Sequence, residues 1–263
     1  MVLLAADIGN AHTVLGLLEP SEGAPGHEVL AHWRVGTDER RTADEWAVLL
    51  RGLLGRQTSE IEGIAVCSTV PSVLHEWRDM LASHLGDVPR VVVEPGVRTG
   101  VPVLMDNPRE VGSDRIINAV AAATLHPGPA IVVDFGGTAT TFDVVSARGQ
   151  YVGGAIAPGI EISLEALGRR GAQLRQVELA RPRTVIAKNT VEALQSGMVF
   201  GAAAQVEGLV HRMVGELGVA VSDVSVIATG YLAPLVLEEC SVFTAHDPWL
   251  TLRGLGLVFD RNR

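Results

Sequence analysis

The chain has 263 residues, of which 47% are hydrophobic and 19% charged, so it is long enough for one large domain or two medium ones around a sizeable core. Its formal net charge is -9 and aromatic residues make up 4%, which disfavours a nucleic-acid partner, because phosphate backbones need clustered positive charge and bases need stacking platforms. No apolar run reaches the length of a membrane span, so we expect no membrane partner. No basic segment precedes the first strand-like run, so we expect no signal peptide. Two cysteines are too few for a disulfide framework, which favours a cytoplasmic protein.

The first half of the chain alternates predicted strands with predicted helices, which indicates an α/β domain. Thr42 and Glu45 form a capping box ahead of an expected helix, and Pro71 suits the first turn of another. In chain order we expect a strand–turn–strand unit at Val2–Leu18, a strand at Val29–Val35, a helix at Trp46–Leu54, a strand at Ile61–Val70, a helix at Pro71–Leu85, a strand at Arg90–Glu94, and a long helix from Gly112 through Ala123.

The second half repeats this order. The expected elements are a strand pair at Ala130–Val145, a strand at Tyr151–Ala157, a helix beginning in Pro158–Leu167, a helix capped by Asn189 with apolar residues at helical spacing to Met213, and a strand at Val224–Thr229. By analogy we interpret the chain as a duplicated ribonuclease-H-like α/β fold of the actin and sugar-kinase type, with an ATP cleft between the halves. The expected domains are residues 1–117 and 118–263.

Two short acidic turns, far apart in the chain, follow strand-like apolar runs. Asp7 ends the first run and Asp134 the second, and a Gly-containing turn with small polar side chains comes after each. Glycine lets backbone N–H groups approach an anion, hydroxyls add donors, and the carboxylate can hold a cation that neutralises phosphate. One such turn alone is typical of any hairpin, whereas two copies favour a duplicated domain that holds a nucleotide.

Several familiar catalytic motifs are absent from the sequence. The chain has no Walker-type phosphate loop, no G-x-G-x-x-G after a strand and no G-x-S-x-G elbow, and no close His or Cys pair predicts a transition-metal site. Phosphoryl transfer remains, because backbone amides and carboxylates can supply the positioning, the charge neutralisation and the proton acceptor that this reaction needs.

The segment PREVGSDR, from Pro108 to Arg115, supplies a candidate proton acceptor. We expect Asp114 near a helix start, where free N–H groups stabilise a carboxylate. Gly112 and Ser113 would leave room for a small substrate, and Arg115 would bind a carboxylate on that substrate. The alternative is that Ser113 or Asp114 only caps the helix while Arg115 lies on the surface.

An ordered set of short motifs runs through the chain, and the set is far more specific than any member. The motifs are DIGNAHTV from Asp7, DNP from Asp106, GSDR from Gly112, VDFGGTATTFD from Val133, GGAIAPG from Gly153, KNT from Lys188, QSG from Gln195 and ATG from Ala228. Together they resemble the type III pantothenate kinases of bacteria, and the resemblance covers essentially the whole chain.

The resemblance implies ATP-dependent phosphorylation of pantothenate, the first step of coenzyme A synthesis. It also implies Mg²⁺ with ATP, a monovalent cation (K⁺ or NH₄⁺), and a homodimer whose substrate site lies at the subunit interface. Carried over by position, Asp114 would be the catalytic proton acceptor, Asp134 would bind the monovalent cation and Thr138 would contact ATP. The ATP phosphates would be lined by Asp7, Ile8, Gly9, Asn10, Ala11, His12, Thr13 and Val14, and pantothenate would be bound by Gly112, Ser113, Asp114, Arg115 and Thr190.

Three positions depart from the family pattern. Gly137 is an extra residue between Gly136 and Thr138. We expect the loop to bulge so that removing Gly137 costs little, and the alternative is that the neighbouring turns have adapted to it. Met105 replaces a frequent Tyr, and Tyr231 replaces a second Gly beside the expected adenine site, where it would crowd or stack on the base. These departures leave a second hypothesis open, a catalytically weak or inactive relative that binds ligands and regulates a partner.

Overall fold

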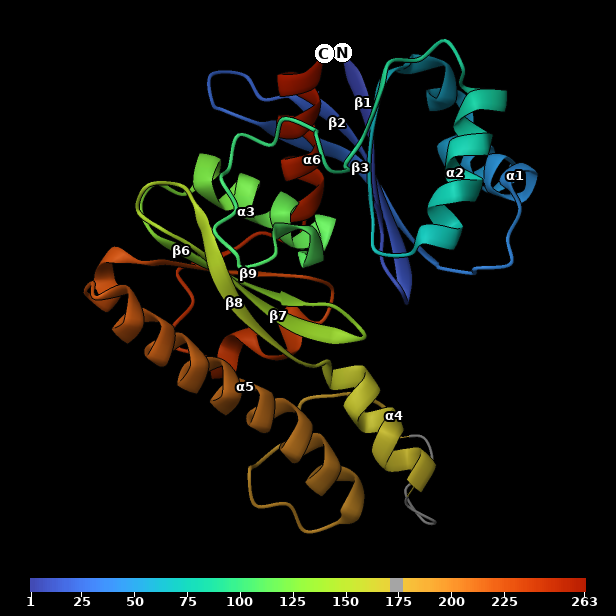
Figure 1. Ribbon diagram of the computed structural model, residues 1–263. Coiled ribbons are helices and arrows are strands. Elements are labelled where there is room, and N and C mark those ends of the chain that lie inside the picture. The colour runs from blue at the N-terminus through green and yellow to red at the C-terminus, as the bar shows by residue number, and fades with distance from the viewer. Residues whose placement is uncertain (171–176) are drawn as a thin grey trace. The chain divides into compact units, whose positions relative to one another are not determined.

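The computed structural model describes residues 1–170 and 177–263, which form two compact units (Figure 1). Unit 1 comprises Met1–Leu125 and Trp249–Arg263, and unit 2 comprises His126–Pro248. Within the described residues, no helix is both long and apolar enough to cross a membrane.

Each unit is built on one five-stranded sheet. The strands of unit 1 are β1 (Val2–Ile8), β2 (His12–Pro20), β3 (His27–Gly36), β4 (Ile61–Ser68) and β5 (Arg90–Val92), and those of unit 2 are β6 (Ala130–Phe135), β7 (Ala139–Val145), β8 (Tyr151–Pro158), β9 (Ser225–Thr229) and β10 (Ala245–His246). The α-helices are α1 (Ala43–Leu54), α2 (Pro71–His84), α3 (Ser113–Leu125), α4 (Ile160–Arg170), α5 (Thr190–Leu217) and α6 (Leu250–Asn262), and the 3₁₀ turns are η1 (Gly55–Glu60), η2 (Pro108–Glu110), η3 (Val221–Asp223), η4 (Ala233–Leu235) and η5 (Leu237–Glu239).

The two sheets have the same topology. The strand order is β3-β2-β1-β4-β5 in unit 1 and β8-β7-β6-β9-β10 in unit 2. In each, the first three strands form an antiparallel meander, and the fourth strand pairs in parallel with the first. This repetition confirms the predicted duplicated ribonuclease-H-like fold.

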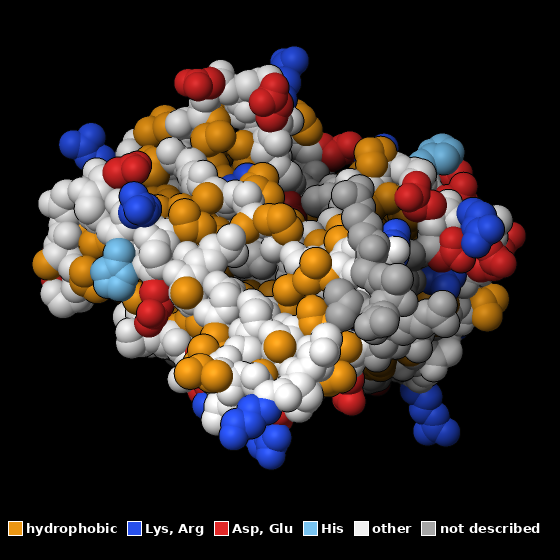
Figure 2. Space-filling model, turned by 90° about the horizontal axis from the view of Figure 1, so that it is seen from below, with side chains coloured by type: hydrophobic (Ala, Val, Ile, Leu, Met, Phe, Trp, Pro, Cys, Tyr) orange, Lys and Arg blue, Asp and Glu red, His pale blue; other side chains and the backbone are white. Residues whose placement is uncertain are grey.

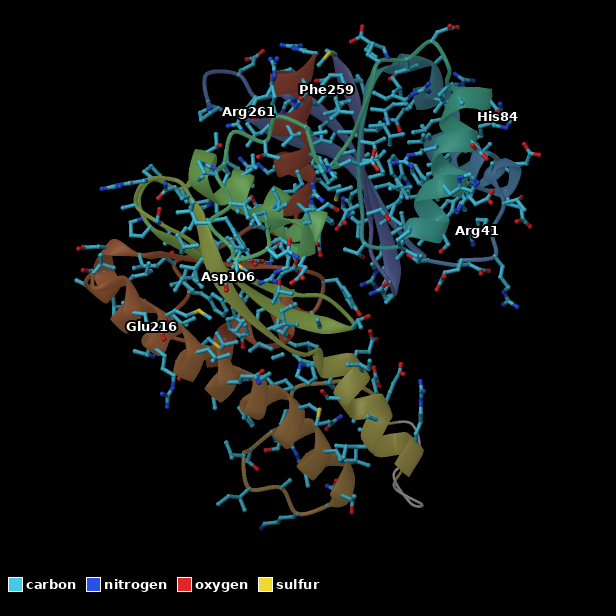
Figure 3. The ribbon with its side chains drawn as sticks, in the orientation of Figure 1. Arg41, His84, Asp106, Glu216, Phe259 and Arg261 are labelled. Atoms are coloured by element: carbon cyan, nitrogen blue, oxygen red, sulfur yellow. The ribbon has the colours of Figure 1, made fainter. Side chains whose placement is uncertain are left out.

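The sheet of unit 1 is covered on both faces because β1 and β4 are apolar along both sides. One face packs with α1 and α2 around Trp46 and Trp77, whose ring centroids are 5.4 Å apart. Helix α6 packs against β1 and β4 as well as against α3. Two of its residues, Phe259 and Arg261, are labelled in Figure 3. Phe259 lies over Gly63, where a Cβ would come within 2.4 Å of the ring, and Arg261 donates hydrogen bonds to Thr99 O and Thr124 Oγ1.

Unit 2 has a core between its sheet and α5. Alternate residues of β6 face Val206, Val210 and Val214 of that helix, as the 3.6-residue period of an amphipathic helix requires. Helix α5 begins at the predicted cap Asn189, which accepts a hydrogen bond from Glu192 N at 2.9 Å, and it ends at Gly218 in the left-handed conformation.

Two expectations about boundaries differ from the structure. The expected division into residues 1–117 and 118–263 separates segments that unit 1 holds together, because α3 is continuous to Leu125 and the C-terminal α6 packs against it. Helix α1 begins directly after the cap Thr42 rather than at Trp46, since the capping box fixes a polar first turn ahead of the apolar face. The sequence interpretation did not include α6 or β10.

Candidate active site

The first acidic turn joins β1 to β2 in unit 1. Ile8 pairs with Thr13, so residues 9–12 form the turn, and Gly9 N donates to His12 O at 3.0 Å. Asn10 and Ala11 are exposed at its tip, whereas Ile8 and Thr13 are fully buried. The tip therefore offers backbone to a ligand, and the two buried residues shape it.

The Asp7 carboxylate lies beside a buried thiol. Parallel pairing of β1 with β4 places Asp7 opposite Cys67, and the Cys67 thiol donates a hydrogen bond to Asp7 Oδ1 at 3.3 Å. Burial raises the pKa of Cys67 well above its ordinary value, and the negative charges of Asp7 and Asp114 raise it further. Cys67 is therefore a neutral donor to Asp7 rather than a reactive thiolate.

Asp114 lies in the first turn of α3 in unit 1. Its Oδ1 is buried and accepts no hydrogen bond from the described residues. Burial raises the pKa of the carboxyl above the ordinary value, against the opposing effects of the backbone hydrogen bond and the charge of Arg115. A carboxylate with a raised pKa is a stronger base, which suits it to accept a proton.

Gly112 makes room for this carboxylate. A Cβ on Gly112 would lie 2.4 Å from Asp114 Oδ1, well inside a contact distance. The space beside Gly112, which we expected a small substrate to use, is therefore occupied by the Asp114 carboxylate.

Ser113 is engaged with the protein backbone. Its hydroxyl accepts from Ser68 N at 3.2 Å and donates to Ser68 O at 3.0 Å, which fastens the start of α3 to the end of β4. The Ser113 hydroxyl is therefore occupied by the backbone of Ser68, and it does not act as a helix cap in this conformation.

The second acidic turn joins β6 to β7 in unit 2, with Asp134 one residue before the strand ends. Gly230, directly after β9, approaches it closely. A Cβ on Gly230 would lie 2.6 Å from Asp134 Oδ1 and 2.7 Å from the carbonyl carbon and oxygen of Phe135, and its φ of +86° already favours glycine. The Asp134 carboxylate is thus packed against a residue that must have no side chain.

The two turns have the same length. Phe135 pairs with Thr140, so residues 136–139 correspond to residues 9–12 of the first turn. The backbone of Gly137 and Thr138 packs on Gly159, where a Cβ would come within 2.4 Å of Gly137 O, and Gly159 N donates to Thr138 O at 3.0 Å. The neighbouring Gly159 is therefore fitted to the turn that contains Gly137, which favours the alternative over our expectation that removing Gly137 costs little.

Because the resemblance implies that this turn contacts ATP, deleting Gly137 is expected to impair phosphoryl transfer. The shortened turn would lose its match with Gly159 and move Thr138, and a displacement of about 1 Å at a reacting group is enough to raise the KM for ATP roughly tenfold or more. Steady-state kinetics with varied ATP measure the effect, and deletion of Gly23, an exposed loop glycine with open space around it, is the control. An unchanged KM for ATP in the Gly137 deletion would contradict this assignment.

Two further predicted residues lie in unit 2. Thr190 is exposed in the first turn of α5, close in sequence to the bidentate pair formed by Arg183 and Glu192 at 2.6 and 3.0 Å. Tyr231 packs against the core of unit 2 and its hydroxyl donates to Glu161 on α4. That bond ties the ring of Tyr231 to α4.

Sequence reasoning missed two residues that hold the first turn, Cys67 and Thr37. The strand register that sets Cys67 opposite Asp7 follows from pairing between segments 60 residues apart, and no local pattern encodes it. Thr37 comes directly after β3 and belongs to none of the sequence motifs, yet its hydroxyl donates a hydrogen bond to Gly9 O at 2.7 Å.

The carboxylates suit a cation that is shared with phosphate oxygens. Within residues 1–170 and 177–263 there is no group of three or more His, Cys, Asp or Glu side chains that would hold a metal alone. Mg²⁺ is commonly bound by one or two carboxylates together with substrate phosphates, so Asp7 in unit 1 and Asp134 in unit 2 fit ions that arrive with a nucleotide.

Comparison with known proteins gives close matches over the full length. The chain is 76% identical over 262 residues to a type III pantothenate kinase of Nocardioides sp., covering 100% of both proteins. It is 64% identical over 268 residues to a type III pantothenate kinase of Streptomyces griseus subsp. griseus, covering 99% of this chain and 98% of the relative.

Solved structures resemble the fold at low sequence identity. The ethanolamine utilization protein EutJ from Carboxydothermus hydrogenoformans gives a TM-score of 0.56 at 16% identity, covering 98% of this chain and 90% of that one. A putative N-acetylmannosamine kinase from Listeria monocytogenes gives 0.53 at 12% identity, covering 99% of each chain. A model of the type III pantothenate kinase family matches residues 3–212, and this match together with the full-length relatives shows that the chain belongs to the type III pantothenate kinases.

Proposed function

We propose that this protein transfers the terminal phosphate of ATP to a hydroxyl of pantothenate, giving 4'-phosphopantothenate for coenzyme A synthesis. The observation that carries the mechanism is the state of Asp114, whose buried Oδ1 has no hydrogen-bond donor among the described residues and whose pKa is raised by burial. Such a carboxylate accepts the proton of the substrate hydroxyl as that hydroxyl attacks the phosphate. Release of ADP with and without pantothenate tests the reaction.

ATP is assigned to the two acidic turns. In unit 1 the exposed tip at Asn10 and Ala11 would offer its backbone to phosphate, beside the carboxylate of Asp7, and in unit 2 Thr138 is exposed in the corresponding turn. Mg²⁺ bound with ATP would neutralise charge on the transferred phosphate, and Asp7 would be its carboxylate ligand in unit 1.

Pantothenate is assigned to the start of α3 in unit 1, and Thr190, at the start of α5, is proposed as a further pantothenate contact. The Arg115 guanidinium is suited to a bidentate contact with the substrate carboxylate. Gly112 and Ser113 act on the same site indirectly, because one leaves space for Asp114 and the other fastens the helix start to β4.

We also propose that Asp134 binds a monovalent cation. ATP phosphates carry several negative charges, and Mg²⁺ leaves part of that charge uncompensated, so a second cation held by Asp134 would complete the neutralisation. We expect turnover to be faster in K⁺ or NH₄⁺ than in Na⁺ at matched ionic strength, and we expect Asp134→Asn to lose this preference. Equal rates in Na⁺ and K⁺ for the unaltered protein would count against the site.

We propose that the protein is a homodimer and that the two copies associate through unit 2. Exposed apolar side chains lie on β8, on α4 and at the start of α5, and Figure 2 shows hydrophobic side chains on the face seen from below, where α4 and α5 lie in Figure 1. Small residues of α5, Gly201 and Ala204, are also exposed and permit close helix packing. Association would remove this apolar surface from water.

Ile156→Glu on β8 is expected to convert the dimer to monomer and weaken pantothenate binding, because it puts a charge into the buried interface. Val48→Glu on α1 is the matched control, since the exposed fractions are 66% for Ile156 and 70% for Val48. Light scattering gives the mass. A fully active monomer of the unaltered protein would defeat this part of the proposal. A cytoplasmic location is proposed as well, consistent with the free cysteines Cys67 and Cys240.

A further inference from the structure

Thr37, the residue directly after β3, contacts the first acidic turn at three points. Its N–H donates to Ala11 O at 3.0 Å, its hydroxyl donates to Gly9 O at 2.7 Å, and the same hydroxyl lies 2.9 Å from Thr13 Oγ1. These bonds reach both sides of the turn formed by residues 9–12.

The direction of the hydrogen bonds follows from the number of protons. A threonine hydroxyl carries one hydrogen, and Thr37 gives its own to the Gly9 carbonyl, which has none to offer. The Thr13 hydroxyl must therefore donate to Thr37 Oγ1. The result is a chain from Thr13 through Thr37 to Gly9, in which each bond polarises the next. Because Thr13 is fully buried and its proton is used in this chain, its hydroxyl holds the turn together.

The duplicated half of the molecule provides an internal comparison. Gly159 follows β8 as Thr37 follows β3, and Gly159 N donates to Thr138 O just as Thr37 N donates to Ala11 O. The backbone bond is thus common to both halves. The side-chain bonds are specific to the first, since Gly159 has no side chain and the turn backbone occupies the space where one would lie.

We propose that Thr37 is a positioning residue for ATP, which holds the first turn in the curvature that directs its backbone N–H groups toward phosphate. This inference rests on the proposed assignment of that turn to ATP. A turn fixed before binding loses less freedom when the nucleotide arrives, and misplacement of phosphate contacts by about 1 Å is costly to turnover. Loss of the hydroxyl is therefore expected to act on ATP and to leave pantothenate binding unchanged.

The test compares three replacements with one control. Thr37→Val keeps the branched shape without the hydroxyl, Thr37→Ala removes the hydroxyl with less bulk in case Val distorts the fold, and Thr37→Ser keeps the hydroxyl. Thr58→Val is the control, because Thr58 also donates from its hydroxyl to a glycine carbonyl, Gly55 O at 3.0 Å, in η1 of the same unit. KM for ATP, KM for pantothenate, kcat and melting temperature are measured for each.

Thr37→Val and Thr37→Ala are expected to raise the KM for ATP about tenfold or more and to leave the KM for pantothenate within about twofold. Thr37→Ser and Thr58→Val are expected to stay close to the unaltered protein. A KM for ATP that stays unchanged in folded Thr37→Val and Thr37→Ala would overturn the inference, as would equal impairment by Thr37→Ser.

Gly9→Ala separates this inference from the assignment on which it rests, because its Cβ would press on His12 O at 3.1 Å within the turn itself. If Gly9→Ala raises the KM for ATP while the Thr37 variants do not, only the role of Thr37 is wrong. If Gly9→Ala and the Thr37 variants all leave the KM for ATP unchanged, both assignments fail.

Discussion

Asp114→Asn is expected to lower kcat by about 10²–10⁴-fold, the usual contribution of a general base, because an amide cannot accept the proton of the substrate hydroxyl. The fold should be retained. Burial raises the pKa of this carboxyl, so the folded protein disfavours its charged form. The stability that Asp114 contributes is full below the pKa that its carboxyl has in the unfolded chain, and it is lost as pH rises through the raised pKa of the folded protein. At neutral pH the Asp114→Asn variant, whose side chain is uncharged, should therefore melt at the same temperature as the unaltered protein or higher.

The matched control for this variant is Asp79→Asn, an exposed carboxylate in the same unit. In the unaltered enzyme, kcat/KM should fall as pH drops through the raised pKa of Asp114, at a pH above the ordinary range of an aspartate. Asp114→Asn should lose this acidic limb. Retention of more than about a tenth of kcat by Asp114→Asn would show that the proton goes elsewhere.

Gly230→Ala is expected to abolish most activity and to destabilise the protein. A left-handed backbone costs a non-glycine residue about 1–3 kcal/mol, and the new methyl group would also press on Asp134 Oδ1 and on the Phe135 carbonyl. Displacing Asp134 should remove the response of turnover to K⁺.

Gly218→Ala separates the effect of backbone strain from the effect of contact with Asp134. Gly218 also has a positive φ, +68°, but nothing lies within 4 Å of its Cβ position. Both variants should lose stability in a denaturant titration, and only Gly230→Ala should lose activity. Activity that falls equally in both would show that backbone strain, and not contact with Asp134, accounts for the loss.

The local elements were predictable because their signals lie within a few residues. The β1 and β6 runs are continuous and apolar, their turns follow an aspartate, and Asn189 caps α5 as its spacing to Glu192 indicates. The duplicated strand order could then be inferred by analogy. Helix α6 was missed because its sequence contains two glycines, Gly254 and Gly256, which are poor helix formers. The fold requires them, since they pack against Ile117 and His27.

The contacts that hold the site together were not predictable from local patterns. Asp114 was identified as a candidate, yet its buried oxygen depends on the absence of a side chain at Gly112, and the start of its helix is fastened by bonds between Ser113 and the distant Ser68. Hydrogen bonds from Cys67 and Thr37 likewise depend on strand register, which a single sequence specifies only through the completed fold.

Pantothenate-dependent ADP release by the purified protein tests the central claim most directly. With ATP, Mg²⁺ and K⁺ present, the account predicts that ADP appears only when pantothenate is added, with one 4'-phosphopantothenate formed for each ADP. Ligand binding without pantothenate-dependent ADP release would contradict it and would favour a ligand-binding regulatory relative.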